Sequence, residues 1–132
     1  MSEHANIQVL KDAYAAFTRG DIAAVMKAFA TDIDWHIPGP KAAPYVGRHK
    51  GTSAVQRFFA QVGETVEFTM FEPREYVAQG DRVVVLGRYA GKIKSTGKPF
   101  DTEWAMAWAL RDGKAVKFHE YTDTEAIGAA FR

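Results

Sequence analysis

The stretch "AVKFHEYTDT", residues 115–124, brings together side chains that can exchange protons, because it contains a His, a Glu, a Tyr and an Asp. Its pattern predicts a strand, whose side chains point alternately to two faces. Glu120 therefore shares one face with Phe118 and Thr122. His119 and Tyr121 belong to the other face. The polar residues of this stretch consequently do not form one site, and acid–base chemistry must rest on one face of the strand.

Other kinds of catalytic site have little support in the sequence. The chain has no cysteine, which excludes disulfides, thiolate metal sites and cysteine nucleophiles. Its four histidines lack the His-x-His and His-Glu-x-x-His spacings that are typical of metal ligands. Neither Ser53 nor Ser95 has the context of a nucleophile elbow, and no glycine-rich phosphate loop follows a predicted strand. We therefore expect no metal ion and no cofactor.

The length and composition indicate one domain that spans residues 1–132. Hydrophobic residues make up 47% of the chain and charged residues 25%, which is ordinary for a globular protein. The formal net charge is +1 and the basic residues are scattered, so we expect no nucleic-acid or membrane partner. No apolar run is long enough for a bilayer and no secretory signal opens the chain, which favours a cytoplasmic protein.

Three helices are expected in the first half of the chain, where apolar residues recur every three or four positions. The first covers residues 5–18; Gly20 then suits a helix C-terminus, and Asp21 suits the N-cap of the second helix. Ser53 and Gln56 form a possible capping box for the third. The predicted buried stripes are Ile7, Leu10, Tyr14 and Phe17; then Ile22, Val25, Met26 and Phe29; then Val55, Phe58, Phe59 and Val62.

Strands dominate the second half. A short strand is expected at residues 32–38, followed by a loop over 39–51 that contains two prolines and three glycines. From Thr65 onward the period becomes two, which predicts strands over residues 65–78, 82–94, 99–110 and 115–123. Pro73 suits a bulge or a sheet edge, and "RDGK" is typical of a tight hairpin. Helices followed by an antiparallel meander indicate an α+β fold.

Such a sheet can enclose a pocket between one face and the helices, which leaves its other face for solvent or a second subunit. Both faces of the strand at 99–110 are largely apolar, so we expect neither to be fully wet. The sequence thus predicts a homodimer through the outer face. The inner set is Trp104, Met106, Trp108 and Leu110, and the outer set is Glu103, Ala105, Ala107 and Ala109.

Three segments carry a resemblance to a known family: "AYAAFTRGDIAAVMKAFATDIDWHIPG", "GRYAGKIKSTGKPFDTEWAMAWALRDGK" and "FHEYTDT". In this order and spacing they resemble the SnoaL-like branch of the nuclear transport factor 2 superfamily, over nearly the whole chain. The resemblance implies a cone-shaped α+β barrel, with three N-terminal helices, one short strand and a four-strand meander around a deep pocket, usually as a dimer. It does not imply one function, because this fold hosts isomerases, cyclases, epoxide hydrolases, dehydratases and non-catalytic binders.

Ketosteroid isomerases of this superfamily offer one comparison of site residues. Their oxyanion-donating tyrosine falls close to Tyr14 on the first helix. Their general-base aspartate falls on Ile37, and their second oxyanion donor falls on or beside Met106. Neither of these two side chains can do that chemistry, so the resemblance implies that the isomerase machinery is absent.

Cyclases and epoxide hydrolases of the superfamily offer two more comparisons. In SnoaL-like cyclases a histidine takes the region of Met106, and the general-base aspartate aligns with Glu120. In limonene-epoxide-hydrolase-like enzymes an arginine lies between two acids; Arg88 matches the arginine, Glu120 matches one acid, and Ala90 takes the place of the other. The resemblance implies that Glu120 points inward, and we expect Arg88 to pair with it across the sheet.

Two functions remain open. The first is a cofactor-independent isomerase, cyclase or hydrolase that acts on an apolar cyclic or aromatic substrate, with Glu120 as base and Arg88 and Tyr14 as charge-stabilising donors. The second is a non-catalytic small-molecule-binding domain that has lost its catalytic acids. His36 is expected to point away from the pocket, although a slip of one residue would reverse this. In both cases the expected substrate-binding wall is Trp35, Ile37, Trp104, Met106, Trp108 and Phe118.

Overall fold

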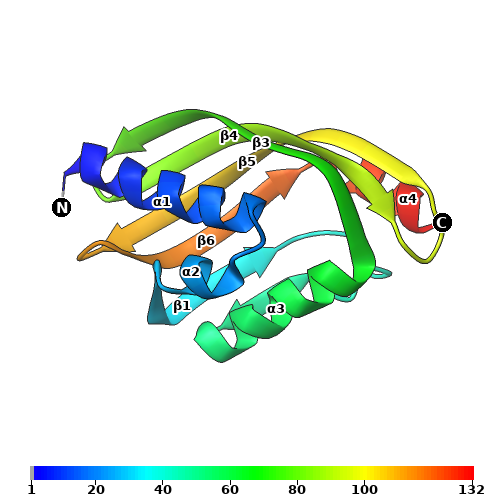
Figure 1. Ribbon diagram of the computed structural model, residues 1–132, viewed down its shortest axis with the longest axis horizontal. Coiled ribbons are helices and arrows are strands. Elements are labelled where there is room, and N and C mark those ends of the chain that lie inside the picture. The colour runs from blue at the N-terminus through cyan, green and yellow to red at the C-terminus, as the bar shows by residue number, and fades with distance from the viewer. Residues whose placement is uncertain (1) are drawn as a thin grey trace.

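A six-stranded sheet forms the centre of the molecule, as seen in a computed structural model that describes residues 2–132 (Figure 1). The order of its strands is β2-β1-β6-β5-β4-β3, in which β1 and β6 run parallel and the other neighbours run antiparallel. The elements are α1 (Glu3–Thr18), α2 (Ile22–Met26), β1 (Phe29–Ile37), β2 (Gly47–Lys50), α3 (Thr52–Thr65), β3 (Val66–Gln79), β4 (Arg82–Ile93), β5 (Pro99–Arg111), β6 (Lys114–Thr122) and α4 (Thr124–Phe131).

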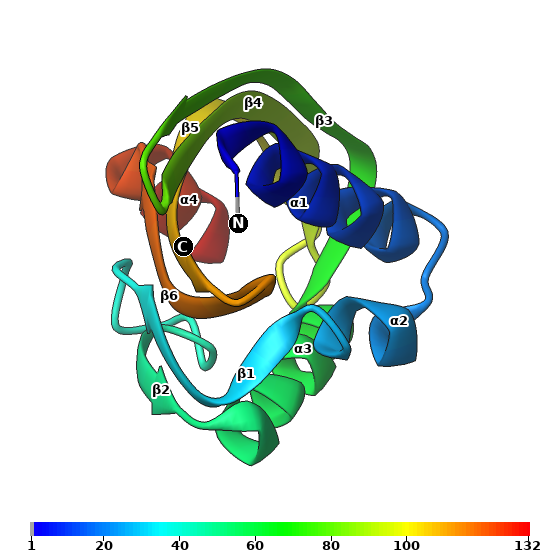
Figure 2. The same cartoon turned by 90° about the vertical axis from the view of Figure 1, so that its left-hand side faces the viewer.

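The sheet is strongly curved, and its curvature creates the inner face. Figure 2 shows that β3, β4, β5 and β6 curl around, with α1, α2 and α3 on the concave side. Helix α4 lies at one end of the sheet, where the hydroxyl of Thr96 in the turn after β4 donates to the backbone carbonyl of Ala130 over 2.6 Å. The α+β cone expected from the sequence is therefore confirmed.

The turn between α1 and α2 forms as its residues predict. Gly20 has a φ of 79°, which a residue without a Cβ adopts at no steric cost. The side chain of Asp21 accepts a hydrogen bond from the backbone N–H of Ala24 over 3.1 Å and so caps α2. Helix α2 is shorter than expected, because it ends at Met26 and Phe29 already begins β1.

Two elements of the structure were not predicted from the sequence, and one predicted helix cap does not form. The predicted loop over 39–51 contains β2, which pairs with β1 along its edge. The C-terminal residues form α4, capped by Asp123, whose side chain accepts from the backbone N–H of Ala126 over 3.0 Å. Ser53 and Gln56 do not form a capping box, because α3 begins one residue after Gly51 and has no side-chain cap. A short polar edge strand such as β2 has too little apolar periodicity to be seen in the sequence.

The long strands agree with the sequence in position, and β5 and β6 also agree in phase. The tight turn between β5 and β6 places Asp112 at φ 52° and Gly113 at φ 78°, as "RDGK" predicted. Strand β3 is an edge strand with an irregularity just after Pro73. Trp104 lies against β4 at Gly87, where an added Cβ would come within 2.4 Å of the indole ring. No helix of residues 2–132 is long and apolar enough to cross a bilayer.

Candidate functional site

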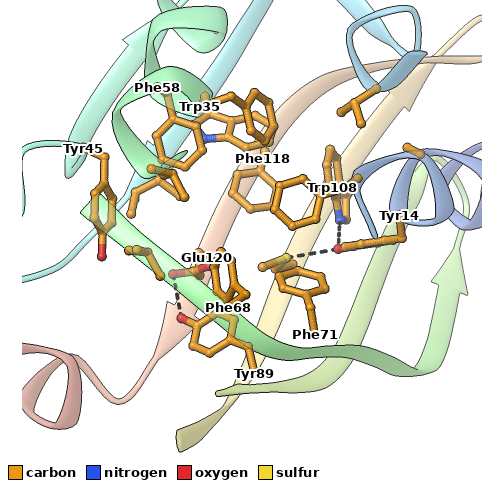
Figure 3. A pocket seen from close by; sticks show the side chains of 18 of the residues that line it. Tyr14, Trp35, Tyr45, Phe58, Phe68, Phe71, Tyr89, Trp108, Phe118 and Glu120 are labelled. Atoms are coloured by element: carbon orange, nitrogen blue, oxygen red, sulfur yellow. Dashed lines mark hydrogen bonds between the residues drawn. The ribbon is translucent and has the colours of Figure 1, made fainter. Parts of the chain in front are cut away.

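An aromatic pocket lies between the concave face of the sheet and the helices (Figure 3). Its volume is about 100 Å³. Side chains from all four helices, from strands β1 and β3 to β6, and from the loop before β2 line it. They are Ala13, Tyr14, Phe17, Val25, Phe29, Trp35, Ile37, Tyr45, Phe58, Phe59, Val62, Val66, Phe68, Phe71, Tyr89, Phe100, Met106, Trp108, Phe118, Glu120 and Ile127.

Glu120 is the one charged residue among these lining side chains. It lies on β6 opposite Met106 of β5, and its Oε1 accepts a hydrogen bond from the hydroxyl of Tyr89 over 3.2 Å (Figure 3). Burial among apolar groups raises the pKa of Glu120 from its ordinary value of 4.5 to about 7, against the lowering effect of the Tyr89 hydrogen bond. A carboxyl group with this pKa can both accept and donate a proton near neutral pH.

Two tyrosines that the sequence did not reveal as site residues join Glu120 at the polar end of the pocket. Tyr89 is on β4 and Tyr45 is on the loop between β1 and β2. Burial, followed by the charge of Glu120, raises the pKa of each phenol, so both hydroxyls stay protonated at neutral pH. His49 of β2 makes a hydrogen bond of 2.8 Å with the backbone carbonyl of Tyr45, which holds the loop in place.

Tyr14 takes part in a second group of hydrogen bonds in the pocket. Its hydroxyl accepts from the indole N–H of Trp108 over 3.0 Å and donates to the Sδ of Met106 over 3.1 Å (Figure 3). Burial raises the pKa of Tyr14 well above its ordinary value, so the hydroxyl keeps its proton. A thioether sulfur is a weak acceptor, and this proton is consequently available to a better one.

Arg88 does not pair with Glu120, contrary to the expectation from the sequence. Its side chain points to the outer face of the sheet, where Nε donates to Asp101 Oδ1 over 2.8 Å. Alternation along β4 therefore brings Tyr89 to the pocket and places both Arg88 and Ala90 outside it. The sequence does not show which face of β4 points inward, because the run from Val83 to Leu86 is apolar on both faces.

The other predicted residues divide into those at the pocket and one behind it. Trp35, Ile37, Met106, Trp108 and Phe118 all line the cavity, together with Tyr14. The rings of Trp35 and Phe118 stack with their centroids 3.9 Å apart, which gives the cavity one flat aromatic wall. Trp104 does not line the cavity, although it was expected to; it lies behind the wall and stacks on Tyr14 with ring centroids 5.9 Å apart.

Two histidines meet on the outer face of the sheet. His36 of β1 and His119 of β6 are cross-strand neighbours, and their Nδ1 atoms lie 3.3 Å apart. The ring of His119 also stacks on Tyr121, whose side chain is 54% exposed. Both histidines therefore point away from the pocket. Within residues 2–132, no three histidine or acidic side chains are grouped so that they could hold a metal ion.

The family model of the SnoaL-like domain matches residues 10–118. The chain belongs to the SnoaL-like domain family. An NTF2-like protein from Burkholderia xenovorans, 39% identical, covers 100% of this chain and 99% of its own, with a TM-score of 0.90. An uncharacterised protein from Mycobacterium tuberculosis is 24% identical over 99% of this chain and 98% of its own length.

A crystal structure of TerC co-crystallised with polyporic acid is also similar. TerC is 28% identical to this chain, with a TM-score of 0.86, and the match covers 96% of this chain and 98% of TerC. These comparisons establish the family and the fold of the chain.

Proposed function

We propose that the protein is a cofactor-independent enzyme of the isomerase type, in which Glu120 moves a proton on an apolar, ring-containing compound held in the pocket. The observation that carries the proposal is the position of Glu120. It is the one carboxyl group among the lining residues, and its pKa is raised to about 7. At neutral pH, a substantial fraction of the protein then has a carboxylate that can take a proton from carbon and return it elsewhere.

The tyrosines complete this proposal. Tyr89 donates to Oε1 of Glu120 and orients the carboxylate, so we assign it a positioning role. Tyr14 is a neutral donor whose proton is held only by the Met106 sulfur. A substrate oxygen that develops negative charge is a stronger acceptor than a thioether, and it would take over this hydrogen bond.

A second candidate function is binding without catalysis. It is favoured by the rest of the lining, which offers no second carboxylate and no cation to activate water or to stabilise charge. The similarity to TerC, which was crystallised with polyporic acid, supports a small-molecule ligand under either candidate.

Proton exchange with solvent distinguishes the two candidates without knowledge of the product. Cyclic ketones incubated with the protein in deuterium oxide should gain deuterium next to the carbonyl, as followed by mass spectrometry. The rate should rise with pH through about 7, because the carboxylate form is the base. Glu120→Gln should keep ligand binding and lower the exchange rate by about 100-fold. If a bound ketone exchanges no faster with wild type than with Glu120→Gln, the protein binds without catalysis.

We further propose a homodimer formed through the outer face of the sheet. Cross-strand neighbours place Val84 beside Ala107, and Leu86 beside Ala105, so a continuous apolar area crosses β4 and β5. Val84 is 37% exposed and Leu86 is 38% exposed, and Tyr121 extends the area on β6. A contiguous apolar surface of this kind is typical of a protein–protein contact.

A further inference from the structure

The volume of the pocket limits the size of what it can hold. An apolar cavity of about 150 Å³ in another protein holds one benzene molecule. The cavity here is smaller, with a volume of about 100 Å³, so it has no room for a fused second ring. Its walls are stacked aromatic side chains, including Trp35 against Phe118 and Phe29 against Phe59, which resist expansion.

The charge of the lining limits the ligand further. No lysine, arginine or histidine is among the lining residues, so nothing in the pocket can neutralise an anionic ligand. An anion would lose its hydration and would also lie near Glu120, which becomes negative as the pH rises through about 7. Arg88, the cation expected from the sequence, lies on the outer face beside Asp101.

The polar end has a free hydrogen-bonding position for a ligand on Glu120. Oε1 of Glu120 is taken by the hydroxyl of Tyr89, whereas Oε2 forms no hydrogen bond with any of residues 2–132. The protonated carboxyl can donate from Oε2 to a carbonyl oxygen, and the carboxylate can accept there from a hydroxyl group. Away from this end, the polar atoms of the lining side chains are the hydroxyl of Tyr14 and the indole N–H groups of Trp35 and Trp108.

We infer that the pocket takes an uncharged compound with a single ring that carries an oxygen, such as a cyclic ketone or its enol, and that it rejects carboxylates and fused ring systems. This inference rests on the proposed function, since it names the substrate class of the same pocket. The small cavity limits the number of rings in the ligand, and the lack of a cation in the lining excludes an anionic ligand. Oε2 of Glu120 forms a hydrogen bond with the oxygen of the ligand.

Four probes test size and charge separately by isothermal titration calorimetry at about pH 6, where Glu120 is mostly protonated. Cyclohexanone and phenol are neutral single rings, benzoate is a charged single ring, and naphthol is a neutral fused ring. Cyclohexanone and phenol should bind at least about tenfold more tightly than benzoate and than naphthol. Equal affinity for benzoate or for naphthol would overturn the inference, as would failure of both neutral single rings to bind.

Enlarging the cavity provides the matched control. Met106→Ala removes side-chain volume from the pocket wall and should raise the affinity for naphthol by about tenfold without improving benzoate. Val62→Ala makes a milder opening on α3, in case the first variant does not fold. Naphthol binding that is unchanged in a folded enlarged variant would contradict the size limit. Deuterium exchange is a separate readout: its absence together with the expected binding pattern would refute the proposed enzyme and leave this inference standing.

Discussion

Replacing Glu120 with Gln should change how the stability of the protein depends on pH. Glu120→Gln keeps the size of the side chain and keeps an oxygen that can accept from Tyr89, but it removes the ionisable group. In the wild-type protein the native state holds the Glu120 proton up to about pH 7, whereas the unfolded chain releases it near 4.5. Between these pH values the native state binds more protons than the unfolded state, so the wild type loses stability as the pH rises.

The magnitude follows from the size of the pKa shift. A shift of one pH unit corresponds to about 1.4 kcal/mol, so moving the pKa from 4.5 to about 7 corresponds to about 3 kcal/mol. The free energy of unfolding of the wild type should therefore fall by about 3 kcal/mol relative to Glu120→Gln between about pH 4.5 and about pH 7.5. Above about pH 8 the difference should be constant, because both states of the wild type are then ionised.

Urea unfolding followed by tryptophan fluorescence measures this difference at a fixed protein concentration across the pH range. Other titrating groups are common to both proteins and cancel in the difference. Glu103→Gln makes the same chemical change at an exposed position of β5 and controls for the lost charge. Tyr89→Phe removes the hydrogen bond that lowers the pKa of Glu120, so it should extend the pH-dependent region to higher pH. Parallel curves for wild type and Glu120→Gln would refute the raised pKa and the choice of Glu120 as base.

Three further outcomes are expected. Arg88→Ala should change stability by less than about 1 kcal/mol and leave pocket binding unchanged in calorimetry, because its ion pair with Asp101 lies on the outer face; lost binding would contradict this placement. Gly87→Ala should destabilise the fold by about 3 kcal/mol in urea unfolding, since its Cβ would clash with the ring of Trp104 and the backbone carbonyl of Glu72, and near-wild-type stability would contradict these contacts. Wild type should sediment at twice its 14.7 kDa chain mass, and Tyr121→Glu should shift it to monomer; a monomeric wild type would refute the proposed dimer.

The sequence by itself determined the order of most elements and which residues share a face of β5 and of β6. Helix and strand periods depend on near neighbours in the chain, so α1, α3 and the four long strands could be predicted from spacing alone. The turn at Asp112 and Gly113 needed only the local preference for positive φ. The inward position of Glu120 needed the family resemblance as well, because alternation gives two phases and does not choose between them.

The tertiary structure decided which groups meet Glu120. Both faces of β4 begin with apolar residues, so only the packed sheet shows that Tyr89 points inward and Arg88 outward. Tyr45 reaches the pocket from a loop, and loops have no repeating pattern from which a side-chain direction can be read. The volume of the cavity depends on how side chains from every helix interlock with the sheet. These features are contacts between residues far apart in the chain, and no local pattern contains them.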